Sequence, residues 1–128
     1  MIPYSSFHEG VTEASLRGGF FEGWPAPPSA AEHVRLLREA THAVLAWEGG
    51  AVVGFVTALS DGVLTAYIPL LEVLPSHRGQ GIGSELVRRL LGDIGPLYMI
   101  DVMCDPAIVP FYEHLGFSAA TGAVMRNR

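Results

Sequence analysis

The chain has 128 residues, of which 49% are hydrophobic and 16% are charged. This length and composition predict one domain over residues 1–128 with a core that folds without disulfides, and they exclude intrinsic disorder. The formal net charge of −5 argues against non-specific binding to nucleic acid, which depends on many contacts between basic side chains and phosphates. All basic residues are arginines, which excludes enzymes that need a lysine Schiff base or a P-loop lysine.

The single cysteine, Cys104, allows neither an internal disulfide nor a cysteine-rich zinc site. We interpret it as a buried thiol in a reducing, intracellular compartment. We expect no signal peptide, and the apolar run 63–74 is too short and too interrupted to span a membrane. The histidines share no metal-ligand spacing, so no metal site is predicted. These features together predict a cytoplasmic protein.

The first 40 residues predict two helices. Apolar residues at helical spacing favour a helix over 12–21, although two consecutive glycines inside it are unfavourable. Ser29 stands three residues before Glu32, which is the pattern of a capping box and predicts a second helix through about Ala40. The residues expected on its inward face are Ala31, Val34, Leu36 and Leu37.

Strands are predicted in the middle of the chain. Residues 42–47 and 51–59 form a hairpin, because the two glycines of the connection 48–50 can supply the positive φ angles of a tight turn. The almost wholly apolar run 63–74 predicts a long strand that is covered on both faces. Pro69 lies in its middle and cannot donate a ladder hydrogen bond, so the pairing should break or bulge there.

The rest of the chain predicts further helices and strands in alternation. An amphipathic helix is expected over 82–91 and an apolar strand over 97–103. Asp105 followed by Pro106 is typical of a helix start, with the aspartate as cap and proline in the first turn. Residues 117–125 favour a last strand or hairpin. This order predicts an α/β protein with antiparallel hairpins early and a βαβα unit late.

The glycine-rich segment 78–84, Arg-Gly-Gln-Gly-Ile-Gly-Ser, lies between a predicted strand and a predicted helix. Unpaired N–H groups and the helix dipole at such a place can bind a phosphate or pyrophosphate, and glycines let the main chain come close to the anion. A connection that binds no ligand is an equal alternative on the glycines alone. Ser84 replaces the third glycine of the dinucleotide fingerprint and the P-loop lysine is missing, so neither motif fits.

Two segments resemble the Gcn5-related N-acetyltransferases, the GNAT superfamily. The motif Arg78-x-x-Gly81-x-Gly83, after residues 73–75, looks like the acetyl-CoA loop of that family. Residues 104–117 resemble its closing helix, especially in the form seen in serotonin-type arylalkylamine acetyltransferases. The resemblance covers roughly residues 44–117. It implies the GNAT acyl-CoA N-acyltransferase fold, in which a mixed, mostly antiparallel sheet with splayed central strands is flanked by helices.

The resemblance implies acetyl-CoA as co-substrate. Leu71 and Val73 would offer main-chain groups to its pantetheine arm. Asp105 stands where many relatives have an asparagine that touches this arm, and helix capping explains it equally well. Arg78 would add charge near the phosphates. The residues whose main-chain amides would bind the pyrophosphate are Gly79, Gln80, Gly81, Ile82, Gly83 and Ser84.

Two side chains are candidates for catalysis. Tyr112 aligns with the family tyrosine that protonates the leaving thiolate, a role that suits a phenol held near the sulfur. Core packing on an apolar helix face is its alternative. Glu72 is the best-placed acceptor for the proton that an attacking amine must lose, and a structurally paired carboxylate is the alternative. Tyr67 and Pro69 replace the two histidines of the serotonin-type proton relay, so the acceptor of those enzymes cannot be carried over.

The leading hypothesis is a transferase that moves the acetyl group of acetyl-CoA to a primary amine of a small molecule by direct attack in a ternary complex. The acidic balance favours a cationic amine. The main alternative is a non-catalytic acetyl-CoA or CoA-binding regulatory module, and a soluble interaction domain is a third option. Members of the family commonly dimerise, so the resemblance is compatible with a homodimer.

Overall fold

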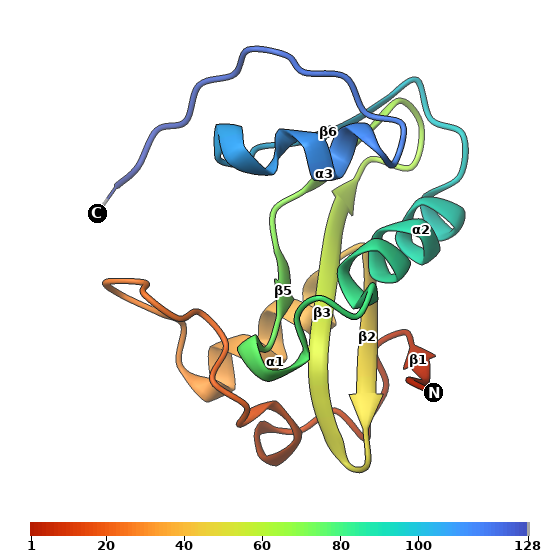
Figure 1. Cartoon of the computed structure of the whole chain (residues 1–128). Coiled ribbons are helices and arrows are strands. Elements are labelled where there is room, and N and C mark those ends of the chain that lie inside the picture. The colour runs from red at the N-terminus through yellow and green to blue at the C-terminus, as the bar shows by residue number, and fades with distance from the viewer. Residues whose placement is uncertain (128) are drawn as a thin grey trace.

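Six strands form a mixed sheet in the computed structural model, which describes residues 1–127 (Figure 1). The strands are β1 (Tyr4–Ser5), β2 (His42–Glu48), β3 (Ala51–Ser60), β4 (Thr65–Ile68), β5 (Leu71–Val73) and β6 (Met99–Val102). Their order is β1-β2-β3-β4-β6, and β5 pairs with β3 off this path. Only β4 and β6 are parallel, whereas the other pairs are antiparallel. The predicted α/β class with a mostly antiparallel sheet is confirmed.

Helices flank this sheet. They are α1 (Ala30–Glu39), α2 (Ile82–Ile94) and α3 (Val109–Glu113), with 3-10 turns η1 (Glu13–Leu16), η2 (Pro75–His77) and η3 (Pro106–Ile108). The predicted capping box is present, since Ser29 Oγ accepts the N–H of Glu32 and the Glu32 carboxylate accepts the N–H of Ser29. Helix α2 runs one turn beyond its predicted end. No helix of residues 1–127 is long and apolar enough to cross a membrane.

Two hydrophobic cores lie on opposite faces of the sheet. Val44 and Ala46 of β2 belong to the core that α2 covers, whereas Ala43 and Leu45 belong to the core that α1 covers. Gly54 of β3 lets α2 come close, because a Cβ at that position would lie 3.2 Å from Leu86 Cδ1. The strand alternation therefore fixes which helix lies on which face.

Pro69 breaks the long predicted strand into β4 and β5, as expected. The N–H of Thr57 in β3 donates to the Leu70 carbonyl at 3.0 Å, so hydrogen bonding to β3 continues across the break. On the other side, β6 pairs with β4 as far as the Ile68–Val102 register. Among the described residues β5 pairs with β3 alone. Its second edge is therefore free, and the central strands are splayed.

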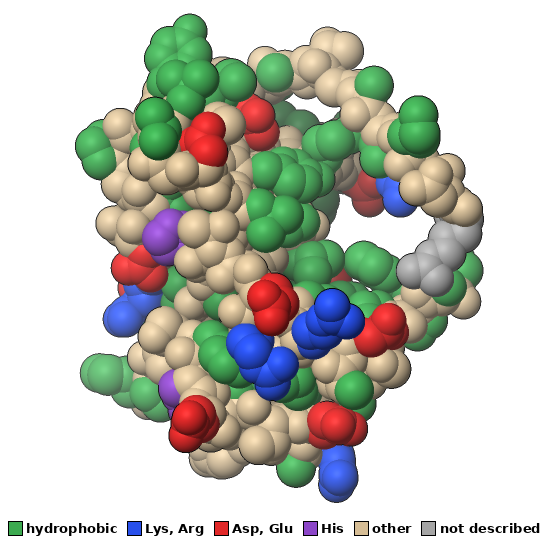
Figure 2. All heavy atoms as spheres, turned by 180° about the vertical axis from the view of Figure 1, so that it is seen from behind, with side chains coloured by type: hydrophobic (Ala, Val, Ile, Leu, Met, Phe, Trp, Pro, Cys, Tyr) green, Lys and Arg blue, Asp and Glu red, His purple; other side chains and the backbone are tan. Residues whose placement is uncertain are grey.

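Two predicted elements are wrong. Residues 12–21 form only the 3-10 turn η1, because Gly18 and Gly19 follow it and Gly19 takes a φ of 93°, which a helix does not allow. Residues 117–125 form no strand. The tail from Ser118 to Asn127 is exposed and stands off from the body of the molecule (Figure 2). Its first half consists of small residues and has little apolar surface to bury on a neighbouring strand.

Smaller corrections concern single residues. In the β2–β3 turn only Gly49 has a positive φ, at 61°, so one glycine and not two supplies the special conformation. On α1, Val34 and Leu37 are buried as predicted, but Ala31 is exposed. His33 is buried at 3% exposure and faces three aromatic rings instead of solvent. A polar residue was missed there because side-chain type alone favours exposure.

Candidate functional site

A cleft of about 430 Å³ runs along the free edge of β5 to the start of α2. Its lining residues are Leu71, Glu72, Val73, His77, Arg78, Gly79, Gly81, Ile82, Gly83, Ser84, Ile108 and Phe111. Three segments that are distant in sequence thus meet here: strand β5, the glycine-rich turn, and the start of the α3 region. Of the predicted cofactor-binding residues, Gln80 and Asp105 do not line the cleft.

The glycine-rich turn depends on backbone conformations that favour glycine. Gly79 has a φ of 79° and Gly81 a φ of 80°. Side chains would find open space at both positions, so the requirement is conformational and not steric. The Gly81 carbonyl then accepts the N–H of Glu85 and begins α2. The first N–H groups of an α-helix have no partner inside the helix, and here the first residues of α2, Ile82, Gly83 and Ser84, line the cleft.

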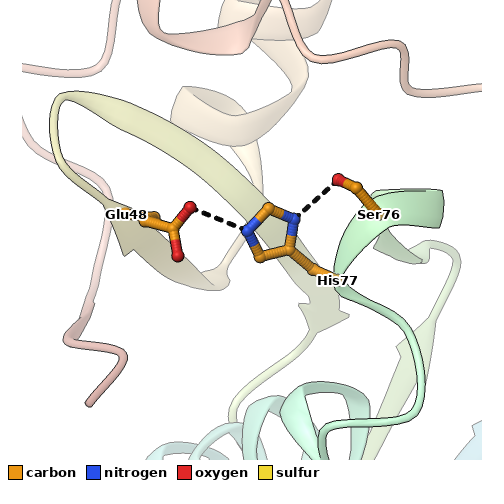
Figure 3. A network of polar contacts seen from close by, with 3 residues as sticks. All are labelled: Glu48, Ser76 and His77. Atoms are coloured by element: carbon orange, nitrogen blue, oxygen red, sulfur yellow. Dashed lines mark hydrogen bonds and ion pairs between the residues drawn. The ribbon is translucent and has the colours of Figure 1, made fainter.

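Side chains anchor the connection that leads from β5 to this turn. His77 Nε2 lies 3.0 Å from Glu48 Oε1, and His77 Nδ1 lies 2.8 Å from Ser76 Oγ (Figure 3). Arg78 Nε donates to the Val73 carbonyl at 3.2 Å. The connection is therefore tied both to the end of the β2–β3 hairpin and to β5. Sequence analysis missed Glu48, because it is 29 residues from His77 and no local pattern links the two.

Tyr112 is buried on α3 at 5% exposure. Its ring lies edge-on to Phe111 and Phe117, with centroids 5.0 and 5.3 Å away. Burial, with a smaller effect of the neighbouring Cys104 thiol, raises the pKa of Tyr112 to about 12. The phenol therefore keeps its proton at neutral pH and can act as a donor. Phe111 lines the cleft and Tyr112 itself does not.

The segment before α3 differs from expectation in two ways. Cys104 is exposed and not buried, because β6 ends at Val102 and the chain then leaves the sheet. The Asp105 carbonyl, and not its carboxylate, accepts the N–H of Ile108 at 2.8 Å. The aspartate side chain is exposed and makes no cap, so capping does not account for it. No group of three or more metal-ligating side chains is found in residues 1–127.

Glu72 is half-buried in the wall of the cleft. Its Oε1 accepts the N–H of Phe21 at 3.0 Å, a contact between residues 51 positions apart. Glu72 is therefore a structurally paired carboxylate, the alternative that the sequence analysis gave for it. The structure thus brings Glu72, the β5 main chain and the glycine-rich turn together, with Tyr112 one residue from the cleft wall.

Comparison with known proteins finds acetyltransferases both among family models and among solved structures. The family model described as "Acetyltransferase (GNAT) family" matches residues 11–117, which begins earlier in the chain than the motifs indicated. A crystal structure of a candidate acetyltransferase from Deinococcus radiodurans R1 is similar at 51% identity and a TM-score of 0.95, covering 98% of this chain and 88% of that one.

Two curated relatives are similar over shorter stretches. Serotonin N-acetyltransferase 2 of Oryza sativa, a chloroplastic protein, is 31% identical over 99 residues, covering 70% of this chain and 50% of the relative. Serotonin N-acetyltransferase of Mesocricetus auratus is 41% identical over 61 residues, covering 45% of this chain and 30% of the relative. This chain therefore spans half or less of the length of either relative.

Proposed function

Because the chain belongs to the acetyltransferase (GNAT) family, we propose that it transfers the acetyl group of acetyl-CoA to a primary amine of a small molecule. The single observation that carries this proposal is the cleft in which the free edge of β5 meets a turn of two positive-φ glycines at the start of α2. Such a turn fits a pyrophosphate, because main-chain N–H groups at a helix start have no partner inside the helix, and Gly79 and Gly81 carry no side chains.

The chain's own residues divide the binding between them. Leu71 and Val73 would hold the pantetheine arm through main-chain groups, with Asp105 near the end of β6 as a further contact. Arg78 would leave the Val73 carbonyl and face the phosphates. The pyrophosphate would be held by the amides of Gly79, Gln80, Gly81, Ile82, Gly83 and Ser84. When bound, acetyl-CoA supplies the activated acyl carbon.

Two side chains would move protons during a direct attack. Glu72 would take the proton that the amine loses, and its position in the cleft wall supports this role. Tyr112 would give a proton to the departing sulfur. Its pKa of about 12 supports that role, because an acid must still carry its proton at neutral pH. No acyl-enzyme is needed in this scheme, since both substrates are bound together.

A cationic small amine is the acceptor that we propose. The net charge of −5 supports a cation, and the names of the two serotonin N-acetyltransferases, which describe those proteins, support an amine. We further propose that the protein acts in the cytoplasm and that it is compatible with a homodimer, since members of the family commonly dimerise. The absence of the two relay histidines leaves the individual amine open to experiment.

Isothermal titration with acetyl-CoA, followed by a thiol-release assay against a panel of primary amines, tests the proposal. We expect one binding site per chain, and CoA release that depends on both the protein and an amine. No binding of acetyl-CoA would overturn the proposal. Binding without transfer to any amine in the panel would overturn the catalytic part and favour the regulatory CoA-binding module.

A further inference from the structure

The imidazole of His77 lies where strand β5 leads into the glycine-rich turn, and His77 is one of the residues that line the cleft. Only 16% of its side chain is exposed. The turn η2 fixes its main chain, because the His77 N–H donates to the Leu74 carbonyl at 2.9 Å. The proposed acetyl transfer does not use this side chain. A titratable ring is therefore held in the cleft wall, next to the residues proposed to bind pyrophosphate.

Both nitrogens of the His77 ring have a partner (Figure 3). Nε2 lies 3.0 Å from Glu48 Oε1, and Nδ1 lies 2.8 Å from Ser76 Oγ. An ionised carboxylate only accepts hydrogen bonds, so Nε2 carries a hydrogen. The Ser76 hydroxyl can donate to a neutral Nδ1 or accept from a protonated one. The ring can therefore gain or lose a proton while both contacts stay in place, and only the serine hydroxyl has to turn.

The charge at this end of the cleft depends on that proton. Glu48 contacts the ring from the end of β2, and its own side chain is 62% exposed. With a neutral ring the pair carries one negative charge, which repels an anionic ligand. With a protonated ring the two charges cancel, and the repulsion is removed. A phosphate close to the ring in turn favours the charged form of an imidazole.

Further charged groups come from the neighbouring elements. Arg78, beside the ring, is a permanent cation and donates to a carbonyl of β5. Glu72 of β5 lines the cleft and accepts a main-chain N–H. Glu85, in the first turn of α2, is paired with two arginines of its own helix. His77 is the histidine among the lining residues, and histidine is the side chain whose charge ordinarily changes between about pH 5 and 8.

We propose that His77 is a proton-linked residue of the cofactor site, which takes up a proton as the pyrophosphate of acetyl-CoA enters the glycine-rich turn. This inference rests on the proposed function, because the anion that protonates the ring is the one held by that turn. Such a linkage is reciprocal, so a ligand that brings a proton with it binds more tightly as the pH falls. The contacts with Glu48 and Ser76 let the affinity follow the pH without a change in the shape of the turn.

Titration calorimetry of the whole chain with dephospho-CoA measures the proton directly. This ligand keeps the diphosphate but lacks the phosphate monoester of CoA, a group that itself titrates near about pH 6. The heats in PIPES and in imidazole buffer differ in proportion to the protons taken up, because the two buffers differ in ionisation enthalpy. At about pH 7 we expect an uptake of about half a proton in the wild type and less than about a tenth in His77→Gln.

His8→Gln, which changes an exposed histidine elsewhere, is the matched control and should take up as much as the wild type. No uptake in the wild type, or equal uptake in His77→Gln, would overturn the proposal.

The pH dependence of the affinity separates proton linkage from damage to the turn. Between about pH 6 and 8, the Kd of dephospho-CoA should rise about fivefold in the wild type and less than about twofold in His77→Gln. The glutamine amide can still donate to Glu48, so at the upper pH the two proteins should agree within about twofold. An equal loss of affinity in His77→Gln at every pH would mean that His77 is only a structural anchor, and would refute the proposal.

NMR of the imidazole nitrogens gives a reading that needs no variant, and it replaces the comparison if His77→Gln does not fold. We expect the protonated fraction of the His77 ring to rise when dephospho-CoA binds at about pH 7. An unchanged fraction at saturation would contradict the linkage and leave the proposed function intact. If the wild type bound neither acetyl-CoA nor dephospho-CoA, the proposed function would fail and this inference with it.

Discussion

Two connecting segments with positive φ angles differ in what their main-chain N–H groups contact. The glycine-rich turn 78–84 places its positive φ angles at Gly79 and Gly81 and leaves main-chain N–H groups at the cleft. The loop 19–24 has a positive φ at Phe21, and the N–H of that residue is already bonded to Glu72. An open set of donors is suited to a ligand, whereas a satisfied donor is suited to fixing shape. We infer that the turn is suited to binding a ligand, whereas the bonded N–H of Phe21 helps to fix the shape of its own loop.

We expect the largest effect on the rate from a substitution at Tyr112. Tyr112→Phe removes the proposed acid but leaves the ring, and kcat should fall about a hundredfold or more. Binding of acetyl-CoA should be unchanged, because the proposed binding groups lie on β5, in the turn and at Asp105, and the Tyr112 hydroxyl is not one of them. Since the pKa of Tyr112 is raised to about 12, the kcat of the wild type should show no loss from deprotonation of this residue below about pH 10. Steady-state rates that are equal in both proteins would remove Tyr112 from the chemistry.

Phe21 of the loop 19–24 packs against His33, a buried residue whose pKa is lowered. Burial lowers the pKa of His33 from 6.5 to about 4, and Nε2 has no hydrogen-bond partner among the described residues. Between these two pH values the unfolded chain binds more protons, so stability is full above pH 6.5 and falls as the pH decreases toward 4. The loss should approach about 3 kcal/mol in the free energy of unfolding.

Urea unfolding at a series of pH values measures this slope. In His33→Phe the decrease between pH 6.5 and 4 should become clearly shallower, whereas His8→Gln, an exposed histidine, should retain it. The same slope in wild type and His33→Phe would show that other groups govern acid stability.

We expect a moderate difference in acetyl-CoA binding between alanine substitutions at two glycines, one at each end of α2. Gly81→Ala places a side chain at a φ of 80° and should weaken acetyl-CoA binding about tenfold, with a loss of about 1 kcal/mol in stability. Gly92→Ala lies in the helix with open space around it and should raise stability by up to about 1 kcal/mol without affecting binding. Titration calorimetry and thermal unfolding measure both. Equal affinities in the two variants would mean that the turn conformation is not needed for the cofactor.

The smallest effect is expected where the turn is anchored to the hairpin. Glu48→Gln weakens the contact with His77. Because the Glu48 side chain is exposed, this contact contributes little, and the Kd of acetyl-CoA should rise only about twofold. The kcat should not change. A tenfold rise would mean that the anchor governs the shape of the turn more than its glycines do.

Sequence signals predicted the parts of this molecule that depend on neighbouring residues. The capping box at Ser29 and Glu32, the break at Pro69 and the turn before α2 each follow from backbone or side-chain chemistry within a few positions. The family resemblance added the fold, and the comparisons confirm it. The residues proposed for the site come mostly from the two segments that carry this resemblance.

What could not be predicted depends on contacts across long stretches of chain. The Phe21–Glu72 and His77–Glu48 contacts join residues 51 and 29 positions apart, and no local pattern marks either pair. His33 is buried against three aromatic rings, two from the loop before α1 and one from β3. The expected strand over 117–125 failed for the opposite reason, since a plausible β pattern without buried apolar partners does not form a strand.

The central claim is that the main-chain N–H groups of the turn 78–84 bind the pyrophosphate of the cofactor. Two-dimensional NMR of the amide groups during titration with CoA tests it directly. We predict that the largest shifts occur at the amides of residues 79–84 and that the amides of residues 19–24 shift much less. Saturable binding that leaves the amides of the turn unchanged would contradict the account.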